Sequence, residues 1–282
     1  MKIDAHQHFW RLDRGDYGWL TPALGPIYRD FAPADFQPLL ERHRIDASIL
    51  VQAAPTVAET EFLLETAGRT PFVAGVVGWI DFDAPDAVGQ IDRLAANPLL
   101  VGVRPMVQDI ADDDWLARAS HNRLFEMLVD RRLVFDALVL PRHLGRLLGV
   151  VERHPALAIV IDHLAKPPIA DGRLDPWRAD MNRLAAHANV ACKLSGMVTE
   201  AGDNWTVERL APFAAIVLDA FGPQRLLWGS DWPVVDLAGG YERWRSAALQ
   251  LIRHLPQQGQ DAILGATAAR VYLGHGRGRQ PC

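Results

Sequence analysis

The chain has 282 residues, 49% of them apolar and 22% charged, which is the balance of an ordinary globular protein. Its net charge is −5 and no basic run exceeds two residues, so the composition argues against a nucleic-acid-binding protein. No stretch of about 18 apolar residues is present that could cross a membrane. The sequence passes from Met1 directly into an apolar run without space for a signal peptide, and we therefore expect a cytoplasmic protein.

Eight short apolar runs recur along the chain, and each has the length of a β-strand. Several are continuously apolar, which is typical of strands buried on both faces of a sheet. In chain order, the runs cover residues 2–9, 47–53, 72–80, 99–106, 133–138, 157–164, 190–194 and 225–230.

The segments between these runs carry apolar residues three and four positions apart, as in Phe36, Leu39 and Leu40, and this spacing predicts amphipathic helices. Alternating strands and helices form right-handed βαβ units around a parallel sheet. Eight such units in 282 residues predict an α/β protein with a single-domain (β/α)8 barrel, or TIM barrel. A doubly wound open sheet is the alternative, but no glycine-rich phosphate-binding motif follows the first run. We expect the barrel to span residues 1–275 and residues 276–282 to form a disordered tail.

The connections after the first, fourth, sixth, seventh and eighth runs are long, whereas the segments that lead back into the strands are short. In a barrel, the long connections all lie at the C-terminal face, where substrates bind. They carry four tryptophans that we expect in the walls of a pocket, Trp10, Trp19, Trp205 and Trp232.

Two histidines close the first run. His6 and His8 are two positions apart, so both side chains point to the same side of a strand. Two imidazoles at a barrel mouth suit either a divalent metal ion or the polarisation of a bound oxygen atom. The alternative is a pair of structural histidines.

Acidic residues and a third histidine end two later runs. Asp162 and His163 end the sixth run, and Asp231 follows the eighth. A carboxylate at the position of Asp231 can act as a general base toward water or ligate a metal. The alternatives are a helix-capping turn for Asp231 and a cap of the following loop for Asp162.

Basic residues lie near two other strand ends. Arg104 lies in the fourth run, and its planar guanidinium suits a carbonyl or carboxylate oxygen of a substrate. A salt bridge to Asp109 is the alternative for Arg104. Lys193 and Ser195, near the end of the seventh run, are weaker candidates for hydrogen bonds to a substrate.

Together these segments resemble the amidohydrolase superfamily, specifically the amidohydrolase-related branch that contains sugar-lactone and pyrone-dicarboxylate lactonases. Within that branch, the details are similar to L-fucono-lactonase-like proteins. A weaker match at residues 265–270 extends the similarity to almost the whole chain. The matching segments are residues 3–10, 102–104, 161–163, 192–196 and 227–233.

The resemblance implies that Asp231 activates a hydrolytic water and that Arg104 binds the substrate. It also implies that three histidines, His6, His8 and His163, hold substrate oxygens or a metal ion.

The chain departs from the two-metal members of the superfamily. Arg104, rather than a Lys or a Glu, ends the fourth run, and Asp136 stands on the fifth run where those members have a His. We therefore expect at most one divalent metal, with zinc bound by His6, His8 and Asp231, or else a metal-independent site.

The sequence thus predicts a hydrolase that opens the ester ring of a sugar-acid lactone, with Asp231, His163 and Arg104 as catalytic residues. A neutral lactone is favoured over a dicarboxylated pyrone because Arg104 is the one arginine at a strand end. A metal-dependent decarboxylase and a sugar-acid-binding protein without turnover are the alternatives, and the oligomeric state is open. The residues expected to bind this small-molecule substrate are His6, His8, Trp10, Trp79, Arg104, Gln108, Lys193 and Trp232.

Overall fold

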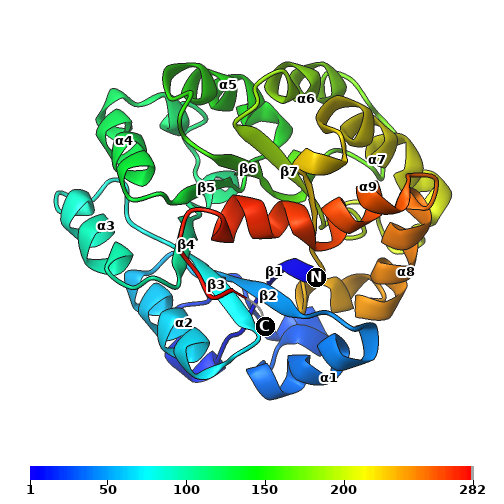
Figure 1. Cartoon of the computed structure of the whole chain (residues 1–282), viewed down its shortest axis with the longest axis horizontal. Helices are drawn as coiled ribbons and strands as arrows, with labels where there is room; N and C mark the ends of the chain where they lie inside the picture. The colour runs from blue at the N-terminus through cyan, green and yellow to red at the C-terminus, as the bar shows by residue number, and fades with distance from the viewer. Residues whose placement is uncertain (281–282) are drawn as a thin grey trace.

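Eight parallel strands form the centre of the molecule, and helices surround them (Figure 1). This computed structural model describes residues 1–280. Each strand pairs with its neighbour in sequence and lies inside one of the predicted apolar runs, which confirms the single-domain (β/α)8 barrel. The strands are β1 (Ile3–Gln7), β2 (Ala47–Val51), β3 (Val73–Gly78), β4 (Leu100–Val103), β5 (Val134–Ala137), β6 (Ile159–Ile161), β7 (Val190–Leu194) and β8 (Leu226–Trp228).

Amphipathic helices pack around the strands, each with one apolar face. In α4, for example, Leu124, Phe125 and Leu128 are buried at the predicted spacing of three and four. Within residues 1–280, no helix combines the length and the apolar character needed to cross a membrane. The outer helices are α1 (Pro33–His43), α2 (Val57–Arg69), α3 (Ala87–Ala95), α4 (Asn122–Asp130), α5 (Leu144–Arg153), α6 (Trp177–Ala185), α7 (Val207–Phe221) and α8 (Gly240–Ile252).

The barrel closes where the chain beyond β8 meets the end of β1. The backbone N–H of Asp231 donates to the carbonyl of His6, and the N–H of His8 donates to the carbonyl of Trp232, both at 2.8 Å. Barrel closure therefore fixes the backbone of four residues that the sequence predicts in the site.

A final helical segment covers the N-terminal end of the barrel (Figure 1, red). Here α9 (Gln257–Asp261) continues into two π-helical turns, η10 (Ala262–Ala266) and η11 (Ala269–Leu273). Gly265 is required where this segment crosses the start of the chain, because a Cβ atom would lie 2.3 Å from a backbone oxygen. Tyr272 is buried among inward-facing strand residues. The mouth of the barrel is therefore at the opposite end.

Residues 276–280 differ from the disordered tail that the sequence predicts. The guanidinium of Arg277 donates to the carbonyls of Leu100 and Ala95, at 2.6 and 2.7 Å, and that of Arg279 donates to the carbonyl of Thr70 at 2.8 Å. These hydrogen bonds hold the segment against the starts of β3 and β4, so the prediction is corrected for residues 276–280. The rest of the predicted tail, residues 281–282, lies outside the described part of the chain.

Glu59 in α2 fixes the loop that follows β2. Its buried carboxylate accepts the backbone N–H groups of Ala53 at 2.9 Å and Ala54 at 2.8 Å. The same loop carries Gln52, whose backbone carbonyl accepts a hydrogen bond from Arg104. Burial raises the pKa of Glu59 to about 8, because a carboxylate is disfavoured away from water. Burial therefore opposes ionisation of the acid that holds this loop.

We expect Glu59→Gln to remove a pH dependence of stability. The folded-state pKa of about 8 exceeds the ordinary value of 4.5, so the native state holds this proton more tightly than the unfolded state. The contribution of Glu59 to the free energy of unfolding is therefore complete below its ordinary pKa and is lost as the pH rises to about 8, a loss on the order of a few kcal/mol. Denaturant unfolding at about pH 5 and about pH 8 should show a larger fall for the wild type than for Glu59→Gln. Glu61→Gln, an exposed position on the same helix, is the matched control, and an unchanged pH dependence in Glu59→Gln would contradict the expectation.

Candidate active site

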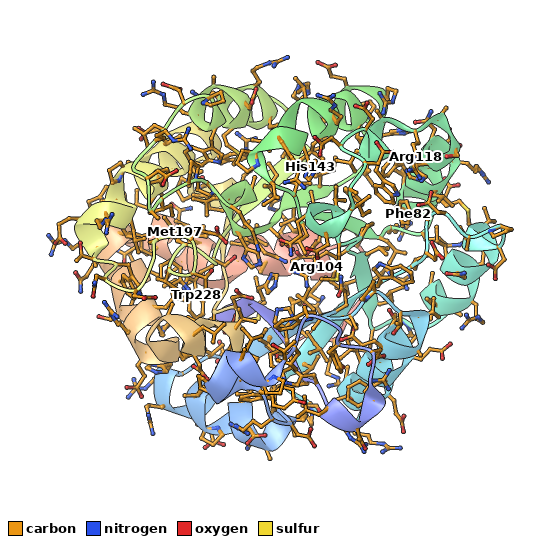
Figure 2. All side chains as sticks on the ribbon, turned by 180° about the vertical axis from the view of Figure 1, so that it is seen from behind. Phe82, Arg104, Arg118, His143, Met197 and Trp228 are labelled. Carbon is orange, nitrogen blue, oxygen red and sulfur yellow. The ribbon has the colours of Figure 1, made fainter. Side chains whose placement is uncertain are left out.

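A cavity of about 240 Å³ opens at the carboxyl ends of the strands, and we call it the mouth cavity. Figure 2 shows this end of the barrel, and Arg104 lies near the centre of the barrel. The predicted site residues that line the mouth cavity are His8, Arg104, Gln108, His163 and Asp231.

A left-handed turn after β6 directs His163 toward the mouth cavity. From His163 to Lys166, four consecutive residues have φ between 50° and 58°. This conformation costs residues other than glycine roughly 1–2 kcal/mol each. Two hydrogen bonds of 2.7 Å hold the turn. The N–H of Lys166 donates to the His163 carbonyl, and the indole N–H of Trp177 donates to the Leu164 carbonyl. Backbone strain of this kind concentrates at functional sites.

Two glycines allow neighbouring strands to approach the site histidines closely. A Cβ atom on Gly229 would lie 2.6 Å from the Cβ of His6. A Cβ atom on Gly196, which has a φ of +62°, would lie 2.5 Å from Nδ1 of His163. A larger residue at either position would therefore displace a site histidine.

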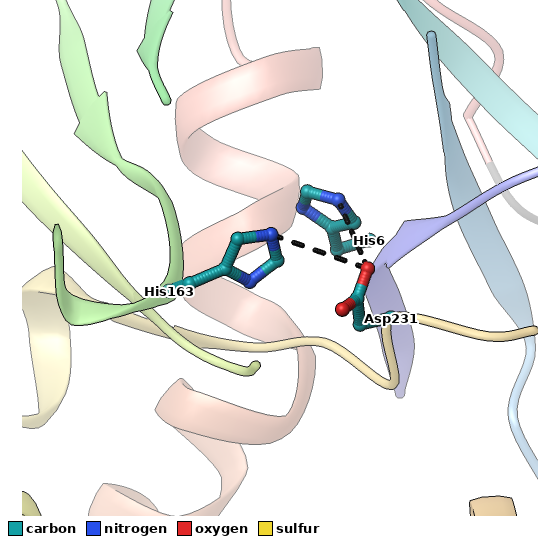
Figure 3. Close-up of side chains that lie close together, drawn as sticks. All are labelled: His6, His163 and Asp231. Carbon is teal, nitrogen blue, oxygen red and sulfur yellow. Dashed lines mark ion pairs between the residues drawn. The ribbon is translucent and has the colours of Figure 1, made fainter. Parts of the chain in front are cut away.

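His6, His163 and Asp231 form a compact cluster (Figure 3). Oδ1 of Asp231 lies 3.6 Å from Nε2 of His6 and 4.0 Å from Nε2 of His163. One potential ligand atom from each residue lies within 4.8 Å of the other two. Two imidazoles and one carboxylate suit a zinc ion that keeps an open coordination position. The structure thus groups His163 with His6 and Asp231, where the sequence predicts His8 as the third ligand.

His8 lies on another side of Asp231. Its Nδ1 donates to the Val51 carbonyl at 2.8 Å, and its Nε2 lies 3.2 Å from Oδ1 of Asp231. Because a carbonyl can only accept, Nε2 donates to Asp231 only when the ring is cationic. In the neutral ring, Nε2 is free to take up a proton. His8 is therefore arranged to exchange a proton with Asp231.

Arg104 belongs to a set of charged side chains beneath the cluster. Its Nη1 lies 3.2 Å from Oδ2 of Asp162 and 3.2 Å from Nε2 of His6, and its Nη2 donates to the Gln52 carbonyl. The partner of Arg104 is thus Asp162, rather than the Asp109 considered from the sequence.

Lys193 extends this set into the barrel. Its Nζ lies 2.5 Å from Asp136, 2.9 Å from Asp162 and 3.2 Å from Nδ1 of His6. From the opposite end of the barrel, the hydroxyl of Tyr272 donates to Asp136 at 2.8 Å. Lys193 is fully buried, so the predicted contact with a substrate is wrong. We call Arg104, Asp162, Lys193, Asp136 and Tyr272 the buried ionic network.

Burial and neighbouring charges set the protonation states of the cluster. Burial lowers the pKa of His6 well below its ordinary value, and the ammonium of Lys193 lowers it further. Burial also lowers the pKa of His163 to about 4. Burial opposes ionisation of Asp231, but the neighbouring His163, His8 and His6 outweigh it and lower the pKa of this carboxyl. At neutral pH, His6 and His163 are therefore neutral and Asp231 is ionised, as metal ligation requires.

Several residues of the predicted substrate-binding set do not line the mouth cavity. Trp10 is buried, and its indole N–H donates a hydrogen bond of 2.7 Å to a backbone carbonyl. Trp232 is also buried, and its ring stacks on Phe36 with 4.8 Å between the ring centroids. Their expected contacts with a sugar are corrected to core packing. His6 is fully buried, and Trp79 lines an adjoining cavity.

Trp19, which the sequence places in the wall of a pocket, lines the mouth cavity. Lys166 lines it as well, although it is not among the predicted site residues. Trp19 lies on the long connection after β1, and its indole N–H donates to the Ala53 carbonyl at 2.7 Å. The length of that connection was the available signal for Trp19. No sequence pattern indicates the left-handed turn that brings Lys166 to the cavity.

Known proteins align with nearly the whole chain. The profile of the Amidohydrolase family covers residues 3–273. The chain is 46% identical over 275 residues to the L-fucono-1,5-lactonase of Burkholderia ambifaria, with 96% of this chain and 95% of that protein covered. It is 38% identical over 292 residues to the L-fucono-1,5-lactonase of Burkholderia multivorans, with 96% of each covered. A crystal structure of a Burkholderia multivorans amidohydrolase with bound zinc has a TM-score of 0.91 at 39% identity, over 97% of this chain and 99% of that one.

We expect Lys193→Met to destabilise the protein by about 3–5 kcal/mol, because it leaves Asp136 and Asp162 without their shared cation. Adding Asp136→Asn should recover part of this loss. Lys166→Met is the matched control, since Lys166 is partly exposed and lies 3.8 Å from Glu200, and it should cost less than about 1 kcal/mol. Denaturant unfolding measures the free energy of unfolding of all three variants. Equal losses for the two lysine variants would show that the buried ionic network contributes little to stability.

Proposed function

Because the chain belongs to the Amidohydrolase family, we propose that it hydrolyses the ring ester of a sugar-acid lactone, with L-fucono-1,5-lactone as the first candidate substrate. The two relatives named as L-fucono-1,5-lactonases align over nearly the full length of the chain and support this substrate class. The observation that carries the proposal is the ionised Asp231 in contact with His8, in a cavity that also exposes the guanidinium of Arg104.

In the proposed reaction, Asp231 takes a proton from a water molecule in the mouth cavity. The low pKa of Asp231 makes it a weak base on its own, so Nε2 of His8, 3.2 Å away, takes up this proton in turn. The water oxygen bonds to the lactone carbonyl carbon, and the bond between that carbon and the ring oxygen then breaks. The proton held by His8 and Asp231 passes to the ring oxygen, which leaves as a hydroxyl, and the product is the open hydroxy acid.

Arg104 is the proposed partner of the carbonyl oxygen, which becomes negatively charged as water adds. Its guanidinium is already oriented by Asp162 and the Gln52 carbonyl, so little reorganisation is needed when the charge develops. His163, fixed through Nδ1 by Ser195 at 2.9 Å, presents its Nε2 on the same side as Asp231.

One divalent metal, with zinc as the proposed ion, fits the donor set of His6, His163 and Asp231. The carboxylate of Asp162, 3.6 Å from Nδ1 of His6, would orient that imidazole as acids beside zinc-bound histidines do. A bound zinc would supply Lewis-acid stabilisation of negative charge on oxygen.

The first prediction is that Asp231→Asn lowers kcat by ~10²–10⁴-fold without changing the melting temperature, because the general base is lost. A pH-stat assay of acid release from L-fucono-1,5-lactone measures the rate. Asp236→Asn, which changes a partly buried aspartate five residues further on, is the control and should keep the wild-type rate. An Asp231→Asn enzyme that turns over at the wild-type rate would remove Asp231 from the mechanism.

The second prediction is a preference for neutral aldonolactones over a pyrone dicarboxylate. A dicarboxylate needs several cationic partners, but Arg104 is paired with Asp162 and Lys166 lies near Glu200. The ratio of kcat/KM values for the two substrate classes measures this preference. A higher kcat/KM for the dicarboxylate would reject the sugar substrate and leave the assignment of Asp231 intact.

A further inference from the structure

A second cavity, of about 480 Å³, adjoins the mouth cavity and has twice its volume. Trp19, Met106 and Asp109 line both, so the two cavities meet at these three side chains. We call the second one the side cavity. In Figure 2, the labelled Phe82, which lines it, lies to one side of Arg104, toward the rim of the barrel. A ligand held at Arg104 would reach the side cavity by passing Trp19.

The walls of the side cavity are aromatic and held in place. The indole N–H of Trp115 donates to Asp83 at 2.8 Å, and the Trp115 ring lies 5.6 Å from that of Phe82. The backbone of Trp79 is held on both sides by the hydroxyl of Thr60, which donates to its carbonyl at 2.8 Å and accepts its N–H at 2.7 Å. Fixed aromatic faces bind flat apolar surfaces with little loss of side-chain entropy.

The polar groups of the side cavity are carboxylates. None of the described residues that line it is basic. Asp16 and Asp83 are paired with Arg14 and Arg118 at 2.7 and 2.8 Å. Over residues 1–280, Asp81 and Asp109 make no ion pair with Lys, Arg or His, although both line the side cavity. Asp81 accepts the backbone N–H of Asp83 at 3.0 Å, and Asp109 accepts the side-chain amide of Gln108 at 3.3 Å, each through one oxygen. The other oxygen of each carboxylate can accept a hydrogen bond from a hydroxyl group, and both carboxylates would repel an anionic ligand.

We propose that the side cavity binds a second, neutral sugar ring, so that the substrates include lactones of disaccharide aldonic acids. This inference rests on the proposed lactonase function and extends its substrate class. A sugar ring offers an apolar face to Trp79 and Trp19 and hydroxyl donors to Asp81 and Asp109. An alkyl chain would offer no donor to the remaining oxygens of these carboxylates, and a uronic acid would be repelled.

The test compares a monosaccharide aldonolactone with disaccharide aldonolactones that carry the second ring on different hydroxyls of the first. The wild type should hydrolyse at least one disaccharide lactone with a kcat/KM equal to or above that of the monosaccharide. Ile110→Trp fills the side cavity from a position that does not line the mouth cavity. It should lower kcat/KM about tenfold for the disaccharide and leave the monosaccharide unchanged.

Two further variants keep this test independent of folding defects. Gly18→Leu also adds bulk to the lining, and a Cβ atom there meets open space, so it should reproduce the selective loss. Val88→Trp, an exposed position outside both cavities, should change neither substrate. If every disaccharide lactone is a poorer substrate than the monosaccharide, or if both filling variants affect the two substrates equally, the inference is wrong. If the wild type hydrolyses neither class, the proposed function itself fails.

Discussion

The site depends on two cations that share one buried carboxylate, Asp162, inside the barrel. Lys193 contacts Asp136 and Asp162, and all three are fully buried. Arg104 contacts Asp162 and also lines the mouth cavity. Charges this deep are tolerated only when they are paired, because the desolvation penalty of each ion is several kcal/mol. The buried ionic network therefore fixes the ends of β4, β5, β6 and β7 relative to one another. Through Tyr272, it also joins the mouth of the barrel to the helical segment at its other end.

The same network shapes the chemistry above it. Burial and Lys193 keep His6 neutral, whereas the neighbouring histidines lower the pKa of Asp231. Nε2 of the neutral His6 lies 3.6 Å from the carboxylate of Asp231. A nitrogen lone pair and a negative charge this close together suit a divalent cation or a polarised water molecule. The strained turn at His163 brings a second imidazole next to Asp231. The backbone strain of this turn is offset by the packing around it.

The fold was predictable because continuous apolar runs and short return segments are properties of single stretches of chain. The cluster was predictable in part, since strand ends converge at a barrel mouth and bring His6, His163 and Asp231 together. The third member of the candidate metal-ligand set was not predictable, because the choice between His8 and His163 depends on a left-handed turn. Trp10 was misjudged because its loop folds back on the barrel, pairing Trp10 with Phe31 and burying the indole. Lys193 was misjudged because burial of an ammonium needs two acids from other strands, which no local pattern indicates.

The central claim is that water activated at Asp231 attacks the carbonyl carbon of a sugar lactone. Hydrolysis of L-fucono-1,5-lactone in ¹⁸O-enriched water tests it most directly, with the uncatalysed reaction measured in parallel. The mechanism predicts an enzymatic rate well above background and one ¹⁸O atom in the carboxylate of the product, with none in the hydroxyl released from the ring. Label in that hydroxyl, or a rate no greater than background, would contradict the claim.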